Sequence, residues 1–248
     1  MQRQGTWPPK IDHPNMKTLL TPPSQNDLIR LLRAWRFWLL GSIIGGLFGM
    51  AFYIVKPPEY RARATVIVSF NMEKAWENKP DNQLFYYLDR EARKVEEVAW
   101  ADITLQQVAD KTGFTVAELR SGKLELTQPQ DGAWHFYAND PTAQTSTHLA
   151  STWAEAFTAQ IQLGIQAAVT LDATRKALQI NPGDKKLQAA IQELESKSLA
   201  ITPELQVSLA QGKNLPAEHK SSLGTYTIAG ATLFLALAGL IILLFGRD

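Results

Sequence analysis

The sequence contains no cysteine among its 248 residues. A disulfide framework, a zinc site with cysteine ligands and a thiol nucleophile are therefore all excluded. Neither sign of charge is in excess, because 25 Lys and Arg residues stand against 24 Asp and Glu residues. A chain so nearly neutral has no general basic field, and nucleic acid is not an expected partner.

Motifs of catalysis and cofactor binding are also missing. The sequence has no phosphate-binding G-x-x-x-x-G-K-[ST], no G-x-S-x-G and no H-E-x-x-H. The histidines His13, His135, His148 and His219 do not have the spacing of metal ligands. We interpret His148 as a surface or core residue of a helix. The sequence therefore predicts a protein that is not an enzyme, with no catalytic residues, no metal and no cofactor.

Charged residues are absent from two long apolar runs. Residues 37–55 and residues 226–245 are 19 and 20 residues long and contain none. At about 1.5 Å of rise per residue, each run can cross the roughly 30 Å hydrocarbon core of a bilayer as a helix. A core helix of a soluble protein normally carries a polar stripe, and a cleaved signal peptide would be shorter and followed by a small-x-small pattern. We predict two transmembrane helices.

Positive charge next to the first run predicts its orientation. Arg30, Arg33 and Arg36 directly precede it, whereas Lys56 and Arg61 follow it. The positive-inside rule then favours a cytoplasmic N-terminus, and two spans return the C-terminus to the same side. We expect both termini in the cytoplasm and residues 56–225 as a domain on the other side of the membrane.

The segments on the cytoplasmic side are short. Residues 1–24 contain five prolines and few apolar residues, which indicates a disordered arm. Residues 25–36 have apolar side chains at helical spacing, and we interpret them as an amphipathic helix at the membrane surface or as an extension of the first span. Residues 246–248 form a cytoplasmic tail.

The outer domain is predicted to be α+β, with a small membrane-proximal sheet. Residues 60–70 alternate and are rich in β-branched side chains, which is typical of a strand, and a loop follows at 71–80. Helical patterns and further alternating patterns follow along the chain. The predicted helices are 83–100, 104–111 and 116–121, and the other predicted strands are 123–128, 133–138 and 204–209. Because the first and last strands adjoin the two spans, we expect them to pair.

A protruding helical hairpin is predicted at about residues 141–199. Asp140 is a suitable cap and Pro141 suits a first helical turn. Apolar residues then recur at four-residue steps until Asn181–Asp184, which has the composition of a turn. A second apolar helix follows this turn.

Small residues recur within both apolar runs. Gly41, Gly45 and Gly49 stand at four-residue steps in the first, and Gly230 and Gly239 lie in the second. Such spacing allows two transmembrane backbones to approach closely, although glycine is also common in transmembrane helices in general. We predict that the two spans pack on each other through these glycines.

Several short motifs occur in a distinctive order between residues 25 and 246. Pro58-x-Tyr60-x-Ala62 follows the first span, Asp140-Pro141-x-Ala143 opens the long helix, and Pro216 precedes the second span. In this order, and with two spans, the chain resembles the Wzz-type chain-length determinants, also called polysaccharide co-polymerases. It is similar to short members without a kinase domain. Its single proline before the second span and its short hairpin depart from the family pattern.

The resemblance implies a ring-like homo-oligomer that regulates the chain length or export of a surface polysaccharide such as O-antigen, capsule or exopolysaccharide. It also implies a bacterial cytoplasmic (inner) membrane protein whose main domain is periplasmic or extracellular. Its implied partners are a membrane polysaccharide polymerase, lipid-linked glycan and, for some short members, a separate tyrosine kinase. An alternative is a non-catalytic accessory or structural subunit of another membrane assembly that reuses this fold. A membrane-tethered sugar-processing enzyme is a third interpretation.

Overall fold

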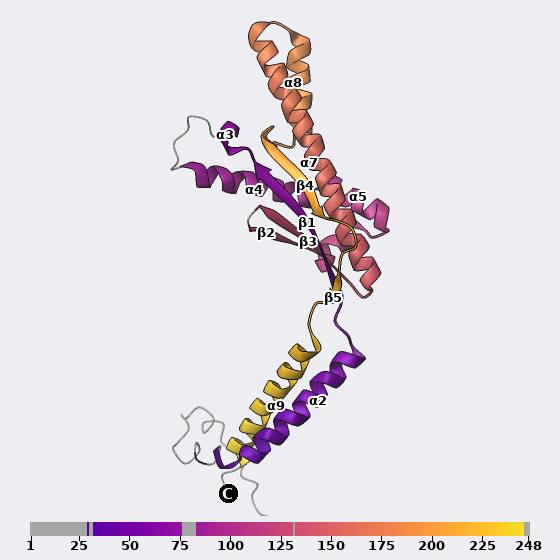
Figure 1. Ribbon diagram of the computed structural model, residues 1–248, viewed down its shortest axis with the longest axis vertical. Helices are drawn as coiled ribbons and strands as arrows, with labels where there is room; N and C mark the ends of the chain where they lie inside the picture. The colour runs from indigo at the N-terminus through magenta and orange to yellow at the C-terminus, as the bar shows by residue number, and fades with distance from the viewer. Residues whose placement is uncertain (1–28, 30–31, 76–82, 131, 246–248) are drawn as a thin grey trace, which may run out of the picture. The chain divides into compact units, whose positions relative to one another are not determined.

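The protein is described from a computed structural model, which places residues 29, 32–75, 83–130 and 132–245 (Figure 1). Two compact units are present. One comprises residues 57–221, and the other comprises residues 1–56 together with residues 222–248. The predicted arm at 1–24, half of the predicted interfacial helix at 25–36 and the tail at 246–248 lie outside the described residues.

An antiparallel sheet organises residues 57–221, as Figure 1 shows. The central strand β1 pairs with β3 along one edge and with β4 and β5 along the other, and β2 pairs with β3. The predicted pairing of first and last strands is confirmed, since Val68 lies opposite Val207. The strands are β1 (Tyr60–Phe70), β2 (Leu124–Gln130), β3 (Ala133–Asp140), β4 (Leu205–Gln211) and β5 (Ala217–His219).

Helices connect these strands. Between β1 and β2 lie α3 (Met72–Ala75), α4 (Leu84–Trp100), α5 (Asp102–Thr112), α6 (Val116–Glu118) and the wide turn η3 (Leu119–Lys123). The prediction of a loop over all of residues 71–80 is wrong, because α3 occupies Met72–Ala75. This helix begins where the Asn71 side chain accepts a hydrogen bond from the Lys74 amide at 3.3 Å. Gly113 ends α5 in the left-handed backbone conformation, at φ +78°, which glycine adopts without steric cost.

The core lies between one face of the sheet and the long helix α7 (Ala143–Ile180). The side chains of Leu149, Trp153, Phe157 and Ile161, which stand at four-residue steps, are completely buried. The ring of Phe136 on β3 meets the rings of Trp153 and Phe157 at centroid distances of 4.8 and 4.9 Å. The predicted apolar face of this helix is therefore its buried face.

The start of α7 differs from the prediction. The cap is Thr142, whose hydroxyl accepts a hydrogen bond from the Thr145 amide at 3.2 Å, and not Asp140. Asp140 is the last residue of β3 and is still paired with Tyr60 on β1. Because Asp140 still belongs to β3 and Thr142 is the cap, Pro141 lies before the helix and not in its first turn.

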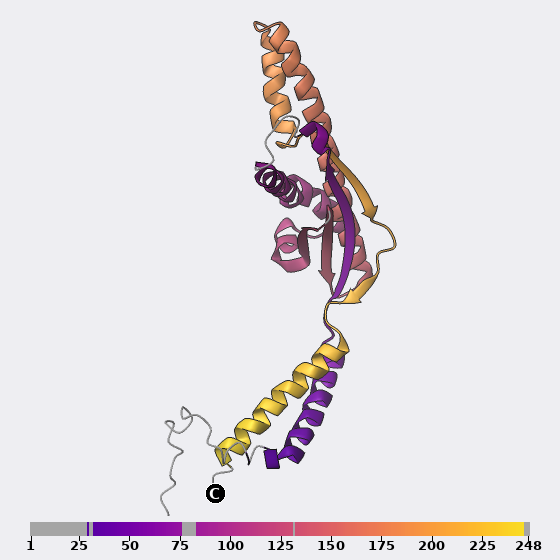
Figure 2. The ribbon, with the colours of Figure 1, turned by 60° about the vertical axis from the view of Figure 1, so that its left-hand side comes forward.

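A helical hairpin is confirmed, with bounds of 143–197 in place of 141–199. It consists of α7 and α8 (Lys185–Lys197), which pack on each other. Asp184 ends the turn, and its carboxylate accepts hydrogen bonds from the amides of Lys186 and Leu187. Within residues 57–221, Figure 2 shows the end of this hairpin extending beyond the sheet.

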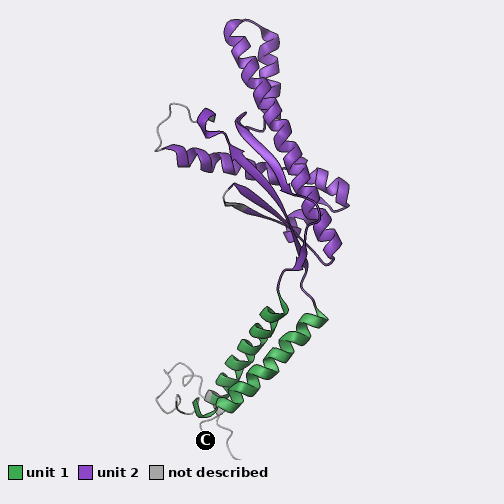
Figure 3. Ribbon diagram, in the orientation of Figure 1, with its two compact units in different colours: residues 1–56, 222–248 green, residues 57–221 purple. Residues whose placement is uncertain are grey.

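The second unit contains two apolar helices, α2 (Trp35–Val55) and α9 (Leu223–Phe245), coloured green in Figure 3. Both are long and apolar enough to cross a membrane. They begin two and three residues before the predicted runs. For α9 the reason is Ser222, whose hydroxyl accepts a hydrogen bond from the Thr225 amide at 3.2 Å and so brings polar residues into the first turn.

Candidate functional site

Glycines mark the contact between α2 and α9. The carbonyl oxygens of Gly230 and Tyr226 occupy the space that a Cβ atom would take at Gly45 and at Gly49. At Gly230, a Cβ would in turn meet the Gly45 carbonyl and would lie 3.0 Å from the Gly49 amide nitrogen. No residue with a side chain fits at these positions without a shift of backbone, so glycine permits the close approach.

The remaining predicted glycines lie at the same contact with more space. A Cβ at Gly41 would stand 3.3 Å from the Cβ of Ala238, and one at Gly239 would stand 3.0 Å from the Trp38 ring. Gly46, which lies beside the four-residue repeat in the sequence, is also buried, and a Cβ there would make an ordinary 3.4 Å contact with Thr227. The structure thus brings all five predicted glycines to one helix–helix contact.

Apolar side chains on the other faces of α2 and α9 are exposed. Phe37, Phe48, Val55 and Ile228 each expose 65% or more of their surface. Many large apolar side chains exposed along one helix are unfavourable in water, and hydrocarbon is the environment that suits them. The exposure separates these helices from core helices of a soluble protein, which would bury the same residues.

The motif residues from three distant segments meet at one end of the sheet. Tyr60 lies opposite Asp140 on one side and opposite His219 on the other, and its ring stacks on the imidazole with centroids 4.0 Å apart. The Nδ1 atom of His219 donates a hydrogen bond to the Pro58 carbonyl oxygen at 2.7 Å. These contacts tie the chain that follows α2 to the chain that precedes α9. Sequence reasoning missed His219, because β5 is too short to give an alternating pattern.

The other motif positions have structural roles in the same region. Ala62 is buried against the core and pairs with both Ala138 and Ala217. Ala143 begins α7, and Pro216 precedes β5. None of these three residues carries a reactive group, so the motif serves the geometry of the strands.

Asp140 is held by three donors. Its carboxylate accepts hydrogen bonds from Lys123 Nζ at 2.9 Å, from the Thr142 amide at 3.0 Å and from the Thr142 hydroxyl at 3.3 Å. Burial by itself raises the pKa of the Asp140 carboxyl, but the lysine and these hydrogen bonds outweigh burial and lower the pKa below its ordinary value. The carboxylate is therefore charged near neutral pH and fixes the turn from β3 into α7.

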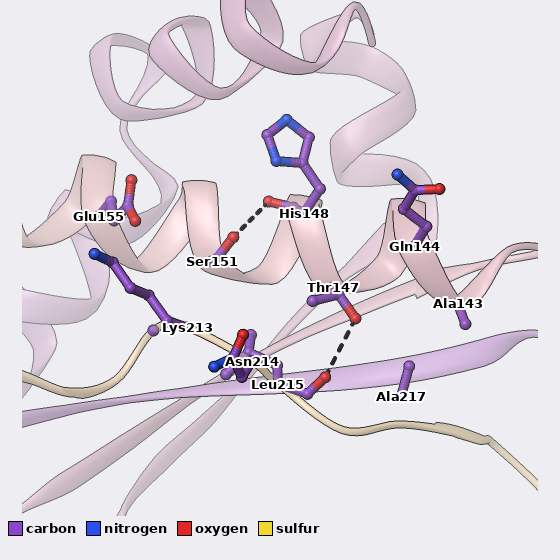
Figure 4. A pocket seen from close by; sticks show the side chains of 11 residues that line it. Ala143, Gln144, Thr147, His148, Ser151, Glu155, Lys213, Asn214, Leu215 and Ala217 are labelled. Carbon is purple, nitrogen blue, oxygen red and sulfur yellow. Dashed lines mark hydrogen bonds between the residues drawn. The ribbon is translucent and has the colours of Figure 1, made fainter.

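An open groove of about 660 Å³ runs between the first turns of α7 and the loop that joins β4 to β5 (Figure 4). The helix contributes amide, hydroxyl, imidazole and carboxylate groups from Gln144, Thr147, His148 and Glu155, and the loop contributes Lys213 and Asn214. Thr147 Oγ1 donates to the Leu215 carbonyl oxygen at 3.5 Å across the groove. His148, interpreted as a surface or core residue, is exposed on this surface.

The serine of the groove, Ser151, makes a hydrogen bond to the backbone. The hydroxyl of Ser151 donates to the backbone carbonyl of His148 at 2.9 Å and not to its ring, so it is not paired with a base. Among the residues that the structure describes, no three His, Asp or Glu side chains are grouped as metal ligands. The groove therefore offers both hydrogen-bond donors and acceptors to a ligand.

Comparison of the sequence with models of known protein families and with curated proteins finds no match.

Proposed function

We propose that this protein is a non-catalytic membrane scaffold that regulates the chain length, or supports the export, of a bacterial surface polysaccharide. In this proposal α2 and α9 cross the cytoplasmic membrane with both termini inside, and residues 57–221 lie in the periplasm or outside the cell. Several copies form a homo-oligomer around or beside a membrane polymerase that extends a lipid-linked glycan. A separate tyrosine kinase is a further partner that the family resemblance implies.

The observation that carries the proposal is the pairing of β1 with both β4 and β5. The chain that leaves α2 and the chain that returns to α9 are joined in one sheet, and the hairpin α7–α8 is built on that sheet. Pairing in one sheet holds the two ends of this domain's chain next to each other. Such an arrangement suits a protein that acts by holding a partner in place.

The polar groove supports the same proposal. Its amide, hydroxyl and carboxylate groups match the donors and acceptors of sugar hydroxyls. The protein would retain or position a growing glycan by reversible hydrogen bonds, while the polymerase performs the bond chemistry. Product length would then depend on how long the polymer stays bound.

The decisive experiment is a size profile of surface polysaccharide from cells with the gene, without it, and with it restored from a plasmid. We expect polymer still to be made without the gene, with a lost or shifted length distribution that the restored gene corrects. An unchanged profile would contradict length control and favour the accessory-subunit interpretation. Proteins that co-purify with the chain would then identify that other assembly.

A further inference from the structure

A second hollow, of about 340 Å³, lies at the end of the sheet where Tyr60 meets His219. Its lining includes Arg61 and Arg63 of β1, Tyr137 of β3, and Glu218 and Lys220 from the segment around β5. Arg61 and Arg63 alternate with the buried Ala62 and therefore project from the face of the sheet opposite the core. We name this hollow the basic pocket.

Arg61 is already positioned in the basic pocket. Its Nη2 atom pairs with Glu125 at 2.8 Å, and its guanidinium carbon lies 3.8 Å from the centre of the Tyr137 ring. The Nε atom of Arg61 is buried and has no hydrogen-bond partner among the described residues. A guanidinium fixed in this way needs little further ordering to bind an anion.

Two further cations are not committed to an ion pair. Among the residues that the structure describes, Arg63 and Lys220 are exposed and form no salt bridge, whereas nine other cation–carboxylate contacts occur. The lining has three cations against the single carboxylate of Glu218. Even with Glu125 included, positive charge remains in excess.

Chain connectivity limits how far the basic pocket can be from the apolar helices. Four residues separate Val55 at the end of α2 from Tyr60, and three separate His219 from Leu223 at the start of α9. A fully extended chain spans at most about 18 Å and about 14 Å over these steps. If α2 and α9 cross a membrane, these short connections keep Tyr60 and His219 within about 18 Å and about 14 Å of the helix ends, which is within reach of the membrane surface.

We propose that the basic pocket binds the phosphate group of a membrane lipid, either a phosphodiester headgroup or a polyprenyl diphosphate. Arg63 and Lys220 would donate to the phosphate oxygens, and Arg61, which lies against the Tyr137 ring, would add a third positive charge. The inference rests on the proposed membrane placement and is independent of polysaccharide length control. In this proposal the sheet contacts lipid through the basic pocket, and the two spans contact lipid separately.

The test uses the full chain, purified in a non-ionic detergent, with bound lipid counted by native mass spectrometry. The probes are phosphatidylglycerol, a polyprenyl diphosphate, phosphatidylcholine and inorganic diphosphate. We expect binding of one or both anionic lipids at concentrations where phosphatidylcholine is not bound, and the stronger of the two identifies the source of the phosphate. Inorganic diphosphate that competes as well as the lipids would overturn the lipid assignment.

Variants then locate the site. Removal of each cation is expected to weaken anionic lipid binding about fivefold, so Arg63→Gln/Lys220→Gln should weaken it about 25-fold. The matched control is Lys185→Gln/Lys186→Gln on α8, which removes the same charge from exposed residues elsewhere. Equal effects of the two double variants would overturn the proposal.

Glu218→Gln provides a test of opposite sign. This variant removes the carboxylate that lines the basic pocket, so we expect anionic lipid to bind about fivefold more tightly. Unchanged or weaker binding would contradict the proposal even if the double variant failed to fold. A chain that fails to insert into membranes would instead contradict the proposed placement of α2 and α9.

Discussion

The protein contains two packed helix pairs that are stabilised in different ways. In α2–α9, backbone approaches backbone at Gly45 and Gly230, while large apolar side chains point outward. In α7–α8, no residue of α8 is fully buried, and the Arg175–Glu195 ion pair at 2.7 Å joins the two helices. One pair has the features of helices packed in lipid and the other those of a hairpin in water.

The difference follows from the surroundings of each pair. In hydrocarbon, burying an apolar side chain gains little, so association depends on close van der Waals contact between small residues. In water, half-buried aliphatic side chains already contribute and charged residues can cover the outer surface. The same chain therefore uses glycine where backbones meet and leucine or isoleucine where a hairpin extends into water.

The largest expected effect is from Gly45→Leu. The added side chain would occupy the position of the Gly230 carbonyl, and overpacking of this kind costs about 1–3 kcal/mol or more. We expect loss of folded, monodisperse chain on size-exclusion chromatography after detergent extraction, and a similar loss for Gly45→Ile. Gly46→Ala is the control, since its Cβ has room beside Thr227. Wild-type recovery of both Gly45 variants would refute the close contact.

Acid should affect the start of α7 and spare the contact between Gly45 and Gly230. The pKa of Asp140 is lower in the folded protein than its ordinary value of 3.8. The carboxylate therefore stabilises the fold fully at pH values well above 3.8, and this stabilisation is lost as the pH falls through the folded-state pKa. Asp140→Asn should cost about 1.5–3 kcal/mol at pH 7 and make unfolding less sensitive to acid. Urea unfolding of both proteins at pH 7 and below pH 4 measures this, and parallel pH profiles would contradict it.

Leu194→Ala tests the half-buried contact within the hairpin. Truncation of a fully buried leucine to alanine lowers the free energy of unfolding by about 2–5 kcal/mol. We expect a loss of about 1–2 kcal/mol here, because Leu194 is only half-buried. Hydrogen exchange of α8 amides should report faster local opening. Gln192→Ala, at an exposed position of the same helix, should leave exchange unchanged. Equal exchange in the two variants would mean that α8 is not stabilised by its apolar face.

The smallest expected effect concerns Arg175 and Glu195, whose side chains are 54% and 50% exposed. A double-mutant cycle with Arg175→Ala and Glu195→Ala should give a coupling of about 0.2–1 kcal/mol in dilute buffer. The coupling should approach zero at about 1 M salt, where charges are screened over about 3 Å. A coupling that persists in salt would indicate that the pair is better shielded than its exposure implies.

Much of the fold was predictable because its signals are local. The alternation of residues 60–70 matches β1 residue for residue, and the four-residue steps from Leu149 to Ile161 identify the buried face of α7. The start of α7 was not predictable, because pairing with Tyr60 decides that Asp140 remains in β3. The glycine spacing indicated which residues of α2 could pack, but the partner atoms at Gly230 and Tyr226 depend on how the two helices cross.

By itself, the sequence determined the two apolar helices, the α+β class and the hairpin, since each depends on residue periodicity along a continuous segment. Tertiary structure alone decided where distant segments meet. The stacking of Tyr60 on His219, the groove between α7 and the β4–β5 loop, and the basic pocket all combine side chains separated by dozens of residues. Such contacts leave no local period in the chain, because strand pairing and packing bring their members together.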